Sequence, residues 1–188
     1  MDDLLQIAVE ACRIALSAGA EFAEVHVGRG RSFSTALERG AIKTSQAREY
    51  GGVSVRAFHR GGVGRSHANV LDPARVREAA ETAAALARQA DADRDFVALP
   101  YPQPLPTVAG LYDDRLAGLS VTDATRLALA GVDEALAAVP DAIIGGGMGV
   151  SVGDHALANS VGVQVASQRS HIGLGLEAVI KRGDNVGI

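Results

Sequence analysis

Five histidines are the side chains in this sequence best suited to bind a transition metal, but their spacing does not favour a metal site. The common helical zinc motif needs two histidines on one helix face beside a glutamate, and no such pair occurs. His59 and His67 fall on separate expected strands that flank a turn. His26, His155 and His171 occupy alternating positions of expected strands, where a solvent-facing or hydrogen-bonded imidazole is the simpler interpretation. The sequence therefore predicts no metal ligand.

A glycine-rich segment at residues 145–149 invites comparison with a phosphate-binding loop. Such a loop follows a strand and opens a helix, so that the amino-terminal end of the helix faces the phosphates. Here the segment runs into Val150-Ser151-Val152-Gly153, which alternates like a strand. We therefore expect a flexible strand or hairpin. A nucleotide-binding enzyme is an alternative that depends on this cluster alone.

The acidic series Asp91, Asp93 and Asp95 resembles the first half of a calcium-binding loop. However, the position that requires glycine holds Phe96, and the position that requires a bidentate carboxylate holds Pro102. We expect a solvated acidic segment here.

The only cysteine, Cys12, lies among apolar residues of an expected helix. A small buried core residue is the commoner role for such a cysteine, and we expect that role in place of a nucleophile. The sequence also contains no G-x-S-x-G nucleophile motif. We predict no catalytic, cofactor-binding or metal-binding residue in this chain.

Length, charge and composition limit the classes of protein to which the chain can belong. A chain of 188 residues, 47% of them hydrophobic, is expected to bury a core without disulfides. Eighteen basic and 22 acidic residues give a net charge of −4, and the scattered arginines argue against nucleic-acid binding. The single cysteine indicates a reducing compartment, and the acidic amino terminus does not resemble a signal peptide. We expect a cytoplasmic protein without a membrane span, since no apolar run approaches about 18 residues.

Hydrophobic periodicity predicts a helix and then hairpin strands in the first half of the chain. Residues 3–18 place apolar side chains on one stripe at helical spacing, and Gly19 ends the helix. From Glu24 the period changes to two, with turns expected at Gly28-Arg-Gly-Arg31 and Arg60-Gly61-Gly62. Short turns of this kind join antiparallel strands. The expected strands cover residues 25–27, 33–37, 41–49, 53–57 and 63–69.

Two further helices are expected, each with a start signal in the sequence. Asp72 can accept a hydrogen bond from a free backbone N–H of the first helix, and Pro73 suits its first position. Ser120 and Asp123 resemble a capping box for the second, which Pro140 ends. Between the two helices, four alternating prolines within residues 100–106 exclude a helix or a central strand and predict a surface connection.

The remaining segments from Val150 to Ile180 are again strand-like, with expected turns at Gly153-Asp154 and residues 159–162. We predict an α+β fold, in which an antiparallel β-meander packs with about three α-helices. Three parts are expected: a helix-meander-helix half at residues 1–99, a Pro-rich connection at 100–119, and a helix with hairpin strands at 120–188. Because the run Ala178-Val179-Ile180 still looks like sheet, we expect the sheet to be truncated at the carboxyl end.

Four segments, in this order, resemble the amino-terminal domain of the TldD/PmbA family, whose members are also called modulators of DNA gyrase. They are Gly19-Ala-Glu-Phe-Ala-Glu-Val-His-Val27, residues 52–58 with 62–66, residues 111–120, and Ala156-Leu-Ala-Asn-Ser-Val-Gly-Val163. Their order and their placement relative to the helices make the combination specific, and the likeness runs over nearly the whole chain. Residues 170–180 look more like the PmbA side of the family.

The resemblance implies a role in proteolysis, because members of this family act as paired subunits that trim or degrade peptides, including microcin precursors and an antitoxin. A TldD-like member holds its zinc with an H-E-x-x-x-H helix in the carboxy-terminal domain, whereas the PmbA-like partner lacks that motif. The motif does not occur in this sequence, so the resemblance carries no catalytic residue over to it. The implied partners are a TldD/PmbA-type subunit or a second copy of the chain, and an unfolded peptide substrate.

We therefore expect the amino-terminal domain of a metallopeptidase-family subunit that serves substrate enclosure or subunit assembly without cutting peptides itself. An exposed sheet edge could capture an extended peptide by strand addition. The alternative is a stand-alone, non-catalytic scaffold domain that binds peptides or proteins and has no link to proteolysis.

Overall fold

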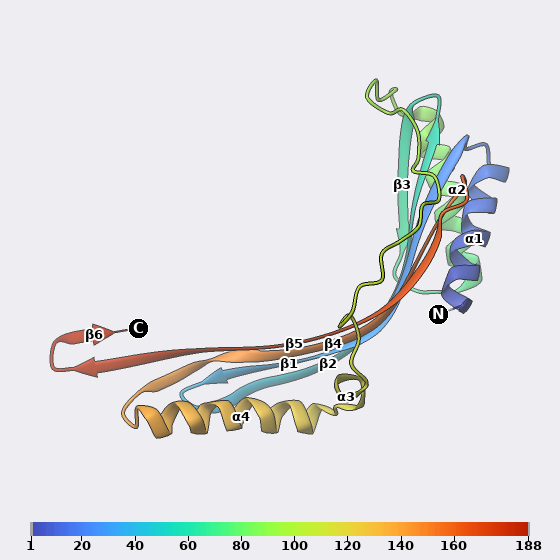
Figure 1. Ribbon diagram of the computed structural model, residues 1–188. Helices are drawn as coiled ribbons and strands as arrows, with labels where there is room; N and C mark the ends of the chain where they lie inside the picture. The colour runs from blue at the N-terminus through green and yellow to red at the C-terminus, as the bar shows by residue number, and fades with distance from the viewer. Residues whose placement is uncertain (1, 188) are drawn as a thin grey trace. The chain divides into compact units, whose positions relative to one another are not determined.

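The computed structural model describes residues 2–187, which form four helices and six strands (Figure 1). The helices are α1 (Asp2–Ser17), α2 (Pro73–Gln89), α3 (Asp114–Gly118) and α4 (Val121–Ala138). The strands are β1 (Phe22–Glu38), β2 (Ala41–His59), β3 (Gly62–Ala68), β4 (Ile143–Asn159), β5 (Gln164–Arg182) and β6 (Asn185–Gly187). The predicted α+β class is confirmed: the three expected long helices are present, and the five-residue α3 is an addition to them.

The strands form one antiparallel sheet in the order β3-β2-β1-β4-β5-β6. Two meanders, β1-β2-β3 and β4-β5-β6, are joined because β1 and β4 lie side by side. Backbone hydrogen bonds mark this β1–β4 seam near both ends: Gly40 N donates to Ile144 O at 2.7 Å, and Ser160 N donates to Ala23 O at 2.8 Å. The sequence predicts each meander from its local turns, and the seam adds the long-range pairing between them.

Four strands are longer than predicted, because several expected turns are continuous strand. β1 runs through residues 28–31 and β4 through residues 153–154, while β2 unites the runs expected at 41–49 and 53–57, and β5 continues without a break from Gln164 to Arg182. The predicted turn at Gly28 is wrong, since this glycine permits close packing in a strand: a Cβ there would lie 3.1 Å from Nδ1 of His155. At Gly153 a Cβ would lie 2.9 Å from the hydroxyl oxygen of Tyr50.

The β1–β2 and β2–β3 hairpin turns each have two successive residues with positive φ. Arg39 and Gly40 have φ of 53° and 74°, and Arg60 and Gly61 have φ of 48° and 82°. Positive φ at both central residues is typical of type I′ turns, whose twist matches that of the flanking strands. The predicted turn at residues 60–62 is thereby confirmed.

The chain forms two compact units, which share its four long strands. Of the described residues, unit 1 contains 2–30, 50–109 and 153–168. Unit 2 contains 31–49, 110–152 and 169–187. Each unit therefore has its own segment of β1, β2, β4 and β5, and each has its own core.

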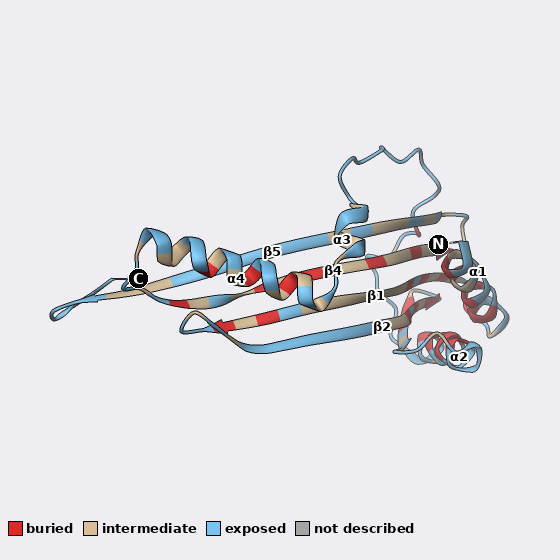
Figure 2. Ribbon diagram, turned by 90° about the horizontal axis from the view of Figure 1, so that it is seen from below, coloured by how far each residue is buried: buried red, intermediate tan, exposed pale blue. Residues whose placement is uncertain are grey.

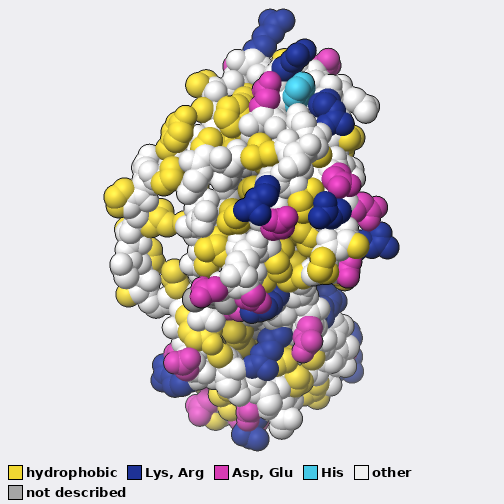
Figure 3. All heavy atoms as spheres, turned by 90° about the vertical axis from the view of Figure 1, so that its right-hand side faces the viewer, with side chains coloured by type: hydrophobic (Ala, Val, Ile, Leu, Met, Phe, Trp, Pro, Cys, Tyr) yellow, Lys and Arg dark blue, Asp and Glu magenta, His cyan; other side chains and the backbone are white. Residues whose placement is uncertain are grey.

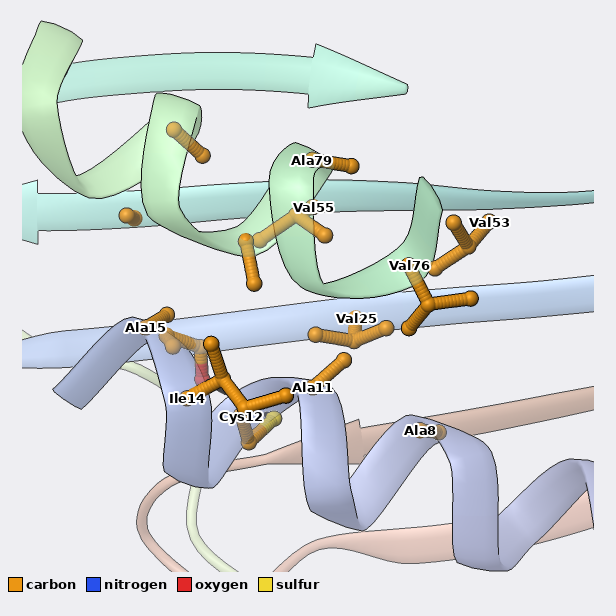
Figure 4. Packing of buried hydrophobic residues seen from close by; sticks show 14 of the residues in the cluster. Ala8, Ala11, Cys12, Ile14, Ala15, Val25, Val53, Val55, Val76 and Ala79 are labelled. Atoms are coloured by element: carbon orange, nitrogen blue, oxygen red, sulfur yellow. Dashed lines mark hydrogen bonds between the residues drawn. The ribbon is translucent and has the colours of Figure 1, made fainter. Parts of the chain in front are cut away.

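The core of unit 1 lies between its part of the sheet and the helices α1 and α2 (Figures 2 and 4). Alanine and valine dominate it, including Ala8, Ala11, Val25 and Val55, which are at most 2% exposed. Small side chains allow short distances between backbones, so a Cβ on Gly64 of β3 would come within 2.0 Å of a backbone oxygen of α2. The close approach explains why this strand position is a glycine.

The start of α2 is fixed by the residue predicted to cap it. Oδ1 of Asp72 accepts hydrogen bonds from the backbone N of Ala74 at 3.0 Å and of Arg75 at 3.2 Å. These bonds satisfy two donors that have no partner within the helix. Pro73 occupies the first turn, where a missing N–H costs nothing.

The core of unit 2 lies between α4 and the second segment of the sheet. The predicted capping box is confirmed, because Ser120 Oγ accepts from Asp123 N at 3.2 Å and Asp123 Oδ2 accepts from Ser120 N at 3.1 Å. The helix ends at Ala138, two residues before Pro140. The buried residues of this core are Leu37, Ala124, Ala128, Val132, Ile144, Met148 and Val150.

The predicted connection after α2 contains no helix or strand up to residue 113, and it is attached to unit 1 at several points. Asp93 N donates to Gly61 O at 2.9 Å, and the ring of Phe96 stacks on that of Phe58 at 4.4 Å between centroids. Further along, Nδ2 of the buried Asn159 donates to Pro100 O at 2.8 Å. Up to residue 109 the connection is thus a mostly exposed but anchored segment of unit 1.

The surface carries charges of both signs. On the face that Figure 3 shows, basic and acidic side chains are interspersed and no stripe of one sign stands out. Among residues 2–187, no helix is long and apolar enough to cross a membrane.

Replacing Asp72 by Ala removes both cap bonds of α2, so we expect the free energy of unfolding to fall by about 1 kcal/mol. Urea denaturation followed by circular dichroism measures the change. Asp91→Ala, which removes an exposed acid beyond the end of α2, is the matched control. An unchanged unfolding midpoint in Asp72→Ala would show that the cap contributes nothing to stability.

Candidate functional site

A shallow hollow of about 280 Å³ lies on the sheet in unit 1. Successive side chains of a strand point to opposite faces, so His26 and Ser54 face away from the helices that cover Val25, Val27 and Val53. The hollow is lined by His26, Gly28, Tyr50, Gly52, Val53, Ser54, His67, Ala68, Asn69 and His155, which come from β1, β2, β4, β3 and the residue after β3.

Two glycines, Gly28 and Gly52, are among the residues that line this hollow. A Cβ on Gly52 would lie 2.6 Å from the carbonyl oxygen of Ala68, a distance that real Cβ atoms do not adopt. On Gly28 it would meet the imidazole of His155 at 3.1 Å. Both glycines therefore leave room for a close neighbour, which is the carbonyl oxygen of Ala68 at Gly52 and the imidazole of His155 at Gly28.

Three of the five histidines line this hollow, although they are far apart in the sequence. The rings of His26 and His155 are stacked, with 5.5 Å between centroids and 22° between planes. His67 lies across the hollow on β3, whereas His59 and His171 are not among the lining residues. The sequence gives no signal for this convergence, because it depends on the pairing of β1 with β4.

The donor set of the hollow fits hydrogen bonding better than metal binding. None of the lining residues is acidic, and no cluster of three His, Cys, Asp or Glu side chains suited to a metal ion is found within residues 2–187. The hydroxyls of Tyr50 and Ser54, the amide of Asn69 and the imidazole of His67 can each donate a hydrogen bond. The arrangement can therefore bind an oxygen-bearing group.

A second candidate binding surface is the outer edge of β5 in unit 2, where backbone groups have no neighbouring strand along most of the edge. β6 pairs only with Ile180–Arg182 of this strand. Just before that edge, Ser170 N donates to Leu111 O at 2.9 Å and Ser170 Oγ accepts from Asp113 N at 2.8 Å. Between these two points, residues 171–179 have no further strand on their outer side in the described part of the chain.

Apolar side chains accompany this open edge. Ile172, Leu174 and Leu176 alternate along β5 and are 38%, 46% and 37% exposed. Leu174 and Leu176 lie against α4, where a Cβ on Gly131 would be 2.8 Å from Cδ2 of Leu174. Free backbone groups next to a row of apolar side chains are the features by which a sheet edge binds an extended peptide.

The other sequence motifs form no site. Residues 145–149 lie inside β4, as expected for a strand, and a Cβ on Gly146 would come within 2.1 Å of Gly175 O of β5. The acidic series lies in the exposed connection, where Asp93 Oδ1 accepts from Asp95 N at 2.9 Å. Neither segment has the geometry of a phosphate or calcium loop.

Cys12 is a core residue, as predicted. It is 5% exposed, and its Sγ donates to Ala158 O at 3.4 Å. Burial, with a smaller contribution from the charge of Glu24, raises the pKa of Cys12 to about 12. The thiol is therefore protonated at neutral pH and unsuited to act as a nucleophile.

Part of the chain is similar to a known family. Residues 23–87 match the family described as PmbA/TldA metallopeptidase domain 1. No curated protein matches the chain. Three solved structures have the same fold as this chain. Their sequence identities to it are below 25%, so the likeness establishes the fold and nothing more. TldE from Thermococcus kodakarensis is 23% identical with a TM-score of 0.87, over 96% of this chain and 40% of that protein.

The other two structures are described as modulators of DNA gyrase. The one from Bacteroides thetaiotaomicron is 23% identical with a TM-score of 0.83, over 98% of this chain and 43% of that protein. The one from Thermotoga maritima is 17% identical with a TM-score of 0.75, over 96% and 40%. This chain thus spans about two fifths of the length of the structures it matches.

The raised pKa of Cys12 predicts slow labelling of the folded protein by Ellman's reagent at pH 8, because the thiolate is the reacting species. We expect the rate to be more than about a hundredfold lower than in guanidinium chloride, where the thiol returns to a pKa of about 8.5. The denatured protein is the control. Equal rates in the two states would contradict the buried position of Cys12.

Proposed function

We propose, from the premise that this chain carries the amino-terminal domain of the TldD/PmbA family, that it binds extended peptides for a peptide-processing assembly and does not cleave them. The observation that carries the proposal is the open edge of β5. The family match over residues 23–87 supports the link to a metallopeptidase.

Strand addition is the proposed mode of binding. The backbone N–H and C=O groups of residues 171–179 would pair with an unfolded peptide as β6 already pairs with residues 180–182. Ile172, Leu174 and Leu176 would contact alternate side chains of that peptide. Main-chain bonds supply affinity without regard to sequence, which suits a protein that handles varied unfolded peptides.

The proposal assigns hydrolysis to residues outside this chain. Metal-dependent hydrolysis requires about three protein ligands and an open position that activates water. Within residues 2–187 no such group of side chains is found, and any zinc would be held by a carboxy-terminal domain of a TldD-like member. A TldD/PmbA-type subunit or a second copy of the chain is the proposed partner that completes the assembly.

Peptide binding tests the proposal through fluorescence anisotropy of a labelled, unfolded heptapeptide. Leu174→Lys places a charge in the apolar row, so we expect Kd to rise by about tenfold or more. Val186→Lys, at a 62% exposed position on β6, is the matched control and should leave Kd unchanged. N-methylation of alternate peptide nitrogens should also weaken binding, since it removes the donors that strand addition uses. Full binding of the N-methylated peptide would contradict this mode.

Cleavage is tested separately by incubating the purified chain with the same peptide, with and without added zinc, followed by mass spectrometry. We expect the peptide to stay intact in both samples. Product that forms with zinc and disappears with a chelator would overturn the non-catalytic assignment.

A further inference from the structure

We propose that the histidine-lined hollow of unit 1 is a carboxylate-binding site, which takes the carboxyl terminus or an acidic side chain of a peptide. This inference rests on the proposed function in one respect, which is that the carboxylate belongs to a peptide. The evidence for the site itself is the distribution of charges and hydrogen-bond donors on the sheet face opposite α1 and α2.

This sheet face changes in character along its length. At one end, Phe58 is covered by Phe96 of the connection, with their rings stacked at 4.4 Å. Next to it, Nη2 of Arg56 on β2 donates a hydrogen bond to Oε1 of Glu24 on β1 at 2.7 Å. Beyond that ion pair, the hollow opens between His26, Ser54 and His67.

The row of charges beside the hollow has an excess of positive charge. In the register of β2 with β3, Arg56 stands opposite Arg65. Glu24 neutralises Arg56, and Arg65, exposed on β3, forms no ion pair with a carboxylate among the described residues. Two residues further along the same face of β3 is His67, which lines the hollow. An anion bound in the hollow would therefore lie next to an unneutralised guanidinium.

The lining supplies donors to such an anion and no competing carboxylate. Ser54 stands opposite His67 in the β2–β3 register, and Asn69 follows on the same face. Tyr50 contributes its hydroxyl from β2, with its oxygen beside Gly153. A carboxylate accepts hydrogen bonds at two oxygens, and it is the acceptor in peptides that gains most from a neighbouring positive charge.

The size of the hollow limits the ligand. At about 280 Å³ it is just below the roughly 300–1,000 Å³ of ordinary small-molecule pockets, so it accommodates a group the size of one residue. The space beside Gly28 and Gly52 is taken by the His155 ring and by the carbonyl oxygen of Ala68, so that group would contact the side chains around these glycines. One terminal or acidic residue of a peptide fits this space.

The test compares peptides of one sequence that differ only in their carboxylates. An acid-free heptapeptide with a free carboxyl terminus is paired with its carboxamide, and an amidated peptide with an internal Glu is paired with its Gln counterpart. Anisotropy should show at least about tenfold tighter binding for the carboxylate member of one pair, and that pair identifies the source as terminal or side-chain. Equal Kd within both pairs would overturn the proposal.

Variants locate the effect. Arg65→Gln combined with His67→Gln changes exposed side chains of β3 only, and it should abolish the difference within the responsive pair. Arg94→Gln removes the same charge from the exposed connection and should preserve that difference. Circular dichroism establishes that each variant is folded. An unchanged difference in the β3 variant would place the carboxylate elsewhere and overturn the site.

The two proposals fail in distinguishable ways. If every peptide binds equally and Leu174→Lys still weakens binding, the carboxylate site is wrong and the peptide-binding function stands. If no peptide binds at all, both are wrong.

Discussion

The pairing of β1 with β4 is the interaction on which the rest of the structure depends. Each meander could form from its own short turns, but only this seam joins them into one sheet. It brings His26 against His155, and it creates the surface on which α1 packs. Cys12 of α1 shows the dependence directly, because its Sγ lies 3.4 Å from Ala158 O of β4 and 3.9 Å from Ala23 O of β1. The small side chain of Cys12 allows α1 to pack closely against β1 and β4 at this position.

Local signals in the sequence predicted the elements whose causes are local. The Asp72 cap, the Ser120–Asp123 capping box and the turn at Arg60-Gly61 each depend on residues within a few positions, and all are confirmed. The three long helices, the antiparallel pairing and the α+β class follow from such signals. The resemblance to the TldD/PmbA family added the identity of the domain, which the match over residues 23–87 supports.

The errors arose at glycines, whose role depends on partners far away in the chain. Gly28 and Gly153 were interpreted as turn residues, yet both lie within long strands and give room to His155 and Tyr50. Nothing next to Gly28 in the sequence distinguishes a turn from a close approach, since the partner is over a hundred residues away. The same cause hid the hollow: three unrelated histidines become neighbours only when the strand order is known.

Both proposed binding surfaces depend on the sheet itself more than on reactive side chains. One uses the free edge of β5, and the other uses neutral hydrogen-bond donors on one sheet face, close to Arg65, which forms no ion pair within residues 2–187. These features suit holding a peptide, because they offer hydrogen bonds and charge at fixed positions without a nucleophile or a metal ligand set. In the proposed assembly, this chain would bind and orient peptides while a partner supplies the chemistry.

The most direct test of this account is the distance between the imidazoles of His26 and His155, because only the β1–β4 seam brings them together. Two-dimensional NMR of selectively labelled protein can detect nuclear Overhauser effects between the ring protons of the two side chains. Stacked rings with centroids 5.5 Å apart should give clear cross-peaks in the wild-type protein and none in His155→Gln. Complete absence of those cross-peaks in folded wild-type protein would contradict the seam, and with it the hollow and the joined sheet.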